Sequence, residues 1–195
     1  MSKHGTIHLA LHGLEELGDR LRSEVVVNIR HEFEPLVNEA GMTLVLTTGR
    51  GLGDLNMDFD TTTPPDPPCT LTFLGEDAGH SVWVRAHQNL RVCGLPNPKT
   101  DKRDVRRFLT NDWLLGRALA NTALHELGHF TADLDHTDTP SNYMFTGGIP
   151  KDQRNLQSQR QTWAGKKTFT PDQRAKIVEQ LKVKRWLGDM VIQGQ

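Results

Sequence analysis

The stretch DWLLGRALANTALHELGHF, residues 112–130, decides the fold of this chain because it predicts a long helix with polar residues at one end. Leu119, Ala123 and Leu127 recur at four-residue steps, which is typical of a helix face that packs against a core. Either residue of the pair Thr110–Asn111 can cap the helix start, since both side chains accept hydrogen bonds from free backbone N–H groups. The sequence therefore predicts a long, partly buried helix in the second half of the chain.

A metal site is the chemistry that this helix predicts. His125 and His129 are four residues apart, so their imidazoles lie on one helix face and can reach one metal ion. Glu126 is offset by about 100° from His125, close enough to stand beside the metal without binding it. Zinc suits imidazole ligands, and a catalytic zinc keeps one position open for water. We therefore expect one catalytic Zn²⁺ held by His125 and His129, with Glu126 as the general base toward a metal-activated water.

The residues that follow the helix carry a family resemblance. The segment 125–148 reads HELGHFTADLDHTDTPSNYMFTGG, with the pair Asp135–His136 and then Met144 after the two histidines. It resembles the metzincin clan of zinc peptidases, whose signature is H-E-x-x-H-x-x-G-x-x-H (or D) followed by a tight turn containing Met beneath the metal. Matrixins and snapalysins are the nearest patterns. The resemblance implies a zinc-dependent endopeptidase whose protein or peptide substrate adds as an extended strand to a sheet edge.

The third metal ligand has two candidates, because the glycine of the family signature is Ala132 here. In the first alignment Asp135 is the ligand and Ala132 makes the turn, which asks a non-glycine residue for positive φ at about 1–2 kcal/mol. In the second, one residue is inserted, Asp133 takes the left-handed conformation that Asp tolerates better, and His136 is the ligand. We favour His136, because zinc prefers imidazole and the spacing from His136 to Met144 equals that of matrixins. The residue that does not bind can serve as a partner of the ligands.

Three further residues near this signature invite a functional interpretation. Met144 is expected to be structural, and its family interpretation depends on the histidines upstream. Tyr143 stabilises an oxyanion if its hydroxyl points into the cleft, although packing is the commoner role of such a residue. The segment 91–96, RVCGLP, resembles the cysteine switch of matrixins, in which a thiolate occupies the zinc. A strand end and turn that happen to contain Cys93 are favoured over this switch. Cys69 and Cys93 form either one disulfide or two free thiols.

Hydrophobic periodicity predicts the remaining elements. Ile7, Leu9 and Leu11 alternate with polar residues and predict a strand, and a helical pattern then runs from about residue 14 to 40, where Pro35 should end or kink the helix. By the same criteria we expect strands at 42–48, 71–73, 81–86 and 90–94. The segments between them are expected to be a surface loop at 49–68, a connector at 96–107 and a loop at 133–168. A last helix is expected to be capped by Thr170 and Gln173 and to run to Leu187.

These elements predict an α+β fold in a single catalytic domain spanning residues 1–195. The resemblance implies a metzincin-like arrangement, namely a mixed twisted sheet with a backing helix and an active-site helix. On this interpretation residues 1–132 form the N-terminal sheet and helix part. Residues 133–195 form a smaller C-terminal part that carries the third ligand, the Met turn and the last helix.

Composition excludes several function classes. The chain has 195 residues and a net charge of -1, which gives no electrostatic reason to expect a nucleic-acid or membrane-surface partner. No apolar run approaches the ~20 residues of a membrane helix, and the N-terminus shows no secretory signal. We therefore expect a cytoplasmic or non-classically released protein, with a monomer favoured over oligomers. The aspartates at 54, 58, 60 and 66 match no calcium-loop spacing, so a solvated acidic loop is favoured over a calcium site.

Two alternative functions stay open at this point. One is a non-catalytic zinc-binding domain derived from a metallopeptidase, against which the intact Glu126 argues. The other is a different HExxH peptidase class with an acidic ligand from a later helix, for which Glu179 is the only late glutamate. No E-x-x-x-D pattern surrounds Glu179, so this second alternative has less support.

Overall fold

The computed structural model describes residues 5–49, 53–60, 75–77, 81–85, 112–145, 162 and 164–183, and within them the chain has an α+β fold. The elements in chain order are β1 (Gly5–His12), the 3₁₀-helix η1 (Leu14–Leu17), α1 (Asp19–Glu39), β2 (Met42–Thr48), β3 (Leu55–Asp60), β4 (Gly75–Asp77), β5 (Ser81–Arg85), α3 (Asp112–Ala132) and α5 (Pro171–Val183). The α+β class expected from the sequence is therefore confirmed.

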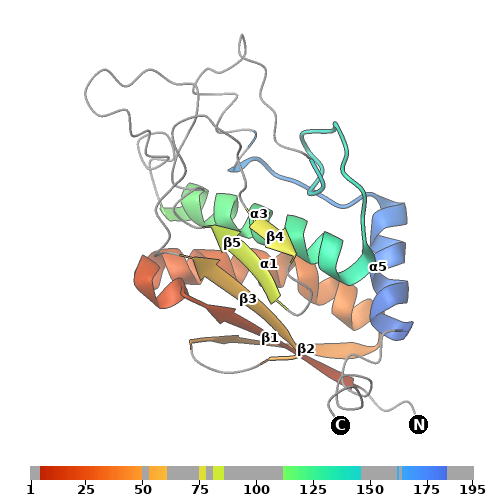
Figure 1. Cartoon of the computed structure of the whole chain (residues 1–195), viewed down its shortest axis with the longest axis horizontal. Helices are drawn as coiled ribbons and strands as arrows, with labels where there is room; N and C mark the ends of the chain where they lie inside the picture. Colours follow the sequence, from red (N-terminus) through yellow and green to blue (C-terminus); the bar gives the residue numbers. More distant parts are fainter. Residues whose placement is uncertain are drawn as a thin grey trace.

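The sheet is mixed, with the strand order β2-β1-β3-β5-β4. Strands β2, β1, β3 and β5 pair in parallel, whereas β4 pairs antiparallel with β5 at one edge. Figure 1 shows α1 and α3 on the same side of this sheet, with α5 beside their ends. Parallel neighbours need a crossover connection, and α1 supplies it between β1 and β2.

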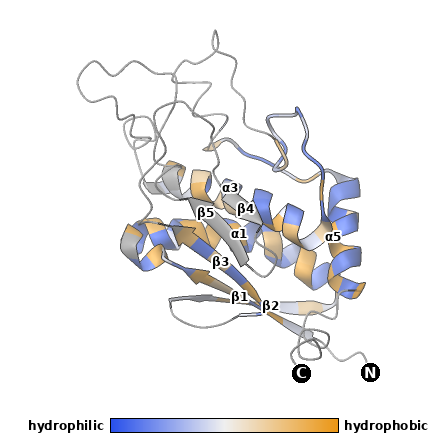
Figure 2. Cartoon of the chain, in the orientation of Figure 1, coloured by the Kyte–Doolittle hydropathy of each residue, from blue (hydrophilic) through white to orange (hydrophobic). Residues whose placement is uncertain are grey.

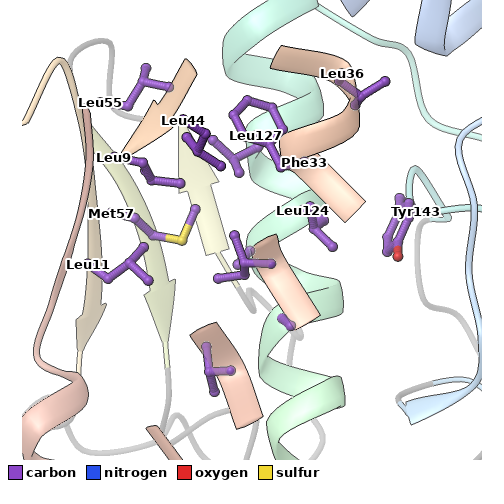
Figure 3. Packing of buried hydrophobic residues seen from close by; sticks show 14 of the residues in the cluster. Leu9, Leu11, Phe33, Leu36, Leu44, Leu55, Met57, Leu124, Leu127 and Tyr143 are labelled. Carbon is purple, nitrogen blue, oxygen red and sulfur yellow. The ribbon is translucent and has the colours of Figure 1, made fainter. Parts of the chain in front are cut away.

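The core lies between the sheet and the two long helices. Figure 3 shows Leu9 and Met57 on the strands, pointing toward Phe33 of α1 and Leu127 of α3. In Figure 2 apolar residues follow β1 and parts of the two long helices, while the loop after α3 is mostly hydrophilic. Burial of one face of each element thus accounts for the alternation and the four-residue steps seen in the sequence.

The contact between α1 and α3 depends on a glycine. A Cβ atom added at Gly116 of α3 would lie 2.5 Å from the Cβ of Glu24 and 3.2 Å from its backbone carbon on α1. Only a residue without a side chain allows two helix backbones to approach this closely. Gly116 therefore fixes the spacing of α1 and α3, and with it the position of α3 over the sheet.

The expected surface loop at 49–68 is wrong at residues 55–60, because these residues form β3 in the middle of the sheet. Leu55, Met57 and Phe59 are buried and alternate with Asn and Asp, which is a strand pattern. The proline run that argued against a strand begins only at residue 64, after β3 has ended. The loop prediction extended the effect of those prolines too far toward the N-terminus.

The first predicted helix also differs from the structure at two places. Gly18 has φ 82° and ψ 153°, and this conformation separates η1 from α1 where the sequence pattern suggested one continuous helix. Pro35 neither ends nor breaks the helix, which continues to Glu39. Because Pro35 is exposed and the next residues, Leu36 and Val37, are fully buried, their packing offsets the backbone hydrogen bond that a proline cannot make.

The remaining elements agree with the sequence where the structure describes them. β2, β5 and α3 are confirmed, while the three-residue β4 was missed because GED has no apolar alternation. At the start of α5, Thr170 N–H donates to Gln173 Oε1 at 2.9 Å and Gln173 N–H donates to Thr170 Oγ1 at 3.2 Å, so the predicted capping box is confirmed. Several predictions fall on residues that the structure does not describe, namely the segments at 71–73, 90–94 and 96–107, the cap at 110–111 and the helix beyond 183. Among the described helices, none combines the length and apolar character that crossing a bilayer requires.

Candidate metal centre

Three histidines converge at the C-terminal end of α3. His125 and His129 come from successive turns of the helix, and His136 comes from the loop that follows it. The Nε2 atom of His129 lies 3.1 Å from that of His125 and 3.0 Å from that of His136, and the third pair is 3.3 Å apart. The three side chains therefore lie close enough to bind one metal ion.

The spacing of these atoms fits the geometry of a tetrahedral zinc site. Nitrogen ligands about 2.0–2.1 Å from one tetrahedral ion lie about 3.3 Å from each other, close to the three separations observed here. Each of the three contacts joins two Nε2 atoms, and a hydrogen bond needs a donor at one of them and an acceptor at the other. Because each Nε2 of a neutral ring is either a donor or an acceptor, hydrogen bonds cannot account for all three contacts at once. The donor set, three imidazole nitrogens that face one point, suits zinc, which takes four ligands in a tetrahedral site.

His125 is held in the tautomer that a ligand needs. Its Nδ1 lies 2.7 Å from the carbonyl oxygen of Tyr143, and a carbonyl oxygen only accepts hydrogen bonds, so Nδ1 carries the proton. The Nε2 atom then presents its lone pair to the other two histidines. Burial lowers the pKa of His125 to about 4, against the opposing effect of the Tyr143 hydrogen bond, so the ring is neutral at pH 7. Neutral imidazole is the form that binds a metal.

The turn after α3 decides which residue joins the two helix histidines. Asp133 has φ 47°, the left-handed conformation expected for the second alignment, and its N–H donates to His129 O at 2.7 Å as in an αL helix cap. Lys176 of α5 donates to the Asp133 carbonyl at 3.0 Å and holds this turn. The turn brings His136 to the cluster, whereas Asp135 is exposed and is not one of the three converging residues.

Met144 lies beneath α3 and is fully buried. A Cβ atom at Gly128 would lie 2.6 Å from the Met144 sulfur, so the glycine next to His129 makes room for this side chain. The Met144 carbonyl accepts from Thr137 N–H at 2.9 Å, which ties the turn to the residue after His136. The expected structural role of Met144 fits these contacts.

The position of Tyr143 does not favour a role in stabilising an oxyanion. Its ring is buried and packs against Phe169, with the ring centroids 4.7 Å apart. Figure 3 shows it beyond α3 as seen from the strands. Burial and the nearby Glu32 carboxylate of α1, which shares a hydrogen bond with the hydroxyl, raise the pKa of Tyr143 well above its usual value. The hydroxyl therefore contacts α1, and the packing interpretation describes Tyr143 better than the catalytic one.

Glu126 lies directly after His125 in α3 and is buried. Helix geometry places it about 100° around the axis from His125, which is where the sequence pattern put the general base. Its carboxylate is shielded from bulk water by the surrounding side chains, a setting in which an acidic group interacts strongly with nearby charge.

Lys167 is a buried cation near the centre that the sequence pattern did not reveal. Its Nζ donates to the Pro140 carbonyl at 2.7 Å and lies 5.3 Å from the centre of the Phe145 ring. Burial lowers the pKa of Lys167 to about 8. Its positive charge is near enough to lower the pKa of His125 as well. No local motif marks this lysine, because its partners lie more than twenty residues away along the chain.

The other sequence candidates lie apart from the three histidines or outside the described residues. Glu179 is exposed on α5 and is not part of the cluster. Asp54 accepts a hydrogen bond from the backbone N–H of His8 at 2.8 Å. Cys69, Cys93, Asp66 and the side chain of Asp60 lie outside the part of the chain that is described.

Comparison with known proteins adds no relative on which to base an assignment. Neither the scan of protein families nor the search of curated proteins returns a significant match to this chain. The assignment therefore depends on the geometry of the three histidines and on the residues around them.

Proposed function

We propose that this chain is a zinc-dependent endopeptidase of metzincin type. The observation that carries the proposal is the convergence of three imidazole nitrogens at 3.0–3.3 Å, with an intact Glu126 next to the first of them in the helix. Three imidazole ligands with an open fourth position are typical of catalytic zinc, whereas structural zinc sites are closed by four protein ligands. A left-handed turn at Asp133 and a buried Met144 packed against Gly128 of α3 support the metzincin resemblance.

The protein's own residues supply the proton transfers of peptide hydrolysis. A bound zinc ion supplies Lewis acidity, which lowers the pKa of water and polarises a carbonyl group. Glu126 accepts the proton that the attacking water loses as the new C–O bond forms. The same carboxylic acid then delivers this proton to the amide nitrogen as the C–N bond breaks, so one carboxylate serves as base and then as acid. His125, His129 and His136 hold the ion throughout.

The sheet offers a place for the substrate main chain. β4 is an edge strand and contacts α3, the helix that carries His125 and His129. An extended peptide can add to such an edge through backbone hydrogen bonds, while side-chain pockets give specificity. This supports a protein or peptide as the substrate class.

The test compares metal content and hydrolysis in matched variants. The parent should contain one zinc ion per chain and cleave an unstructured protein. Glu126→Gln should keep the zinc and lose about 10²–10⁴-fold in rate, because the general base is removed and the ligands are not. Glu179→Gln, an exposed glutamate on α5, is the control and should cleave like the parent.

The outcomes separate the proposal from its alternatives. A parent that binds zinc but cleaves nothing between pH 6 and 9 would be the non-catalytic zinc domain instead. Loss of zinc in Glu179→Gln would point to an HExxH peptidase that uses an acidic ligand from the last helix. Either result overturns the proposed function.

A further inference from the structure

The peptide group between Tyr143 and Met144 is held at both of its polar ends. Its C=O accepts from His125 Nδ1 at 2.7 Å, and its N–H donates to the side-chain oxygen of Asn142 at 2.7 Å. The C=O and N–H of one trans peptide group are coplanar and point in opposite directions. Whatever fixes the direction of the N–H therefore also fixes the direction of the carbonyl that His125 uses.

Asn142 is itself firmly positioned. Its side chain is buried, and its Nδ2 donates to Gln173 Oε1 at 2.8 Å. Gln173 Oε1 also accepts from the backbone N–H of Thr170, in the capping box of α5. The two contacts of the Asn142 amide assign its orientation, because a flipped amide would place an NH₂ group against the Met144 N–H. Asn142 thus connects the start of α5 to the peptide group beside the histidines.

We propose that Asn142 is a positioning residue of the metal centre. It orients the Tyr143–Met144 peptide so that the Tyr143 carbonyl holds His125 as the Nδ1–H tautomer, with Nε2 facing His129 and His136. The inference deepens the proposed function, on which it rests for the identity of the ion. Replacing a group that orients a metal ligand in this way typically weakens metal binding by about 10–100-fold.

The experiment measures two properties for a set of variants at position 142 and one control. The first property is the tautomer of His125 in the metal-free protein, read from long-range ¹H–¹⁵N NMR of the imidazole. The second is the zinc dissociation constant, measured by competition with a chelator. The variants are Asn142→Leu, which removes the acceptor at similar size, and Asn142→Asp, which keeps it. The control is Thr170→Ala, which weakens the α5 cap without touching the peptide group.

We expect Asn142→Leu to show mixed His125 tautomers and about 10–100-fold weaker zinc binding. Asn142→Asp should keep the Nδ1–H tautomer, since its carboxylate still accepts from Met144 N–H, and should bind zinc more tightly than Asn142→Leu but less tightly than the parent, because it cannot donate to Gln173 Oε1. Thr170→Ala should bind zinc like the parent. If Asn142→Leu is folded and leaves both readouts unchanged, or if Thr170→Ala loses as much affinity, the inference is overturned.

A second pair of variants keeps the test decisive if Asn142→Leu does not fold. Asn142→Ser and Asn142→Ala differ by a single hydroxyl, which can accept from an N–H two residues ahead. Asn142→Ser should bind zinc more tightly than Asn142→Ala and should favour the Nδ1–H tautomer more strongly. Equal zinc affinity and equal tautomer populations in the two variants would contradict the role of Asn142. Neither readout needs peptide hydrolysis, so an inactive parent would overturn the proposed function and leave this result standing.

Discussion

The buried ammonium of Lys167 makes stability depend on pH in a specific direction. Burial lowers its pKa from 10.5 to about 8 in the folded chain. Below pH 8 the group is charged in both states, so the full cost of burying the charge is present. Between pH 8 and 10.5 the folded state loses its proton while the unfolded state keeps it, and the free energy of unfolding rises with pH. A shift of this size corresponds to about 3 kcal/mol over the whole interval.

We expect this rise to disappear in Lys167→Met, measured as urea unfolding at pH 7.5 and pH 9.5. The control is Lys166→Met, which removes an exposed lysine next to it and should keep the pH dependence of the parent. Comparing the change in unfolding free energy between the two pH values across the proteins removes the contribution of the titrating groups that they share. A parent with the same pH dependence as Lys167→Met would show that Lys167 is not the buried cation described here.

At the level of elements, the absence of a side chain at Gly116 sets how closely α1 and α3 approach. Gly116→Ala adds a Cβ atom 2.5 Å from the Cβ of Glu24 and 3.3 Å from the Val25 backbone nitrogen. Alanine gains up to about 1 kcal/mol in helix propensity over glycine. Overpacking typically costs about 1–3 kcal/mol, and a backbone neighbour cannot move aside as a side chain can.

The steric cost should therefore exceed the gain, and Gly116→Ala should lower the free energy of unfolding by about 1 kcal/mol, with a larger loss in Gly116→Val. Chemical denaturation of the three proteins measures this order. An alanine variant more stable than the parent would mean that the two helices can separate at little cost. Because α3 also carries His125 and His129, the valine variant is in addition expected to bind zinc more weakly.

The same elements show what the sequence could predict and where it could not. α3 and its two histidines follow a local period, and the choice of His136 follows from which residue tolerates the left-handed turn, Asp133. β3 was missed because its alternation is short and a proline run follows it. Asn142 has its partner Gln173 31 positions away, so only the tertiary fold reveals its role. Local periodicity and turn chemistry are readable from sequence, but contacts made between distant segments are not.

At the scale of the whole molecule, the candidate metal centre joins the end of α3, the loop after it and the start of α5. His125 and His129 come from α3, His136 from the loop, and Asn142 connects that loop to α5. An ion that binds only the folded chain stabilises it by about 2.7 kcal/mol at 100 times Kd and by about 4.1 kcal/mol at 1,000 times Kd. For a chain of this size each kcal/mol raises Tm by about 2–4 °C.

Zinc should therefore raise Tm by about 5–15 °C, and chelation should reverse the rise. His136→Ala should lose most of this gain, because only two imidazoles remain, whereas Asp135→Ala should keep it. The reverse order in calorimetry would make Asp135 the third ligand. Hydrogen exchange localises the effect, since chelation should speed exchange at Thr137 N–H, which donates to Met144 O, far more than at Leu9 in the sheet. Leu134, Tyr143 and Met144 pack this loop into the core, so the effect of the ion is expected to be largest in the exposed stretch around His136 that lies between them.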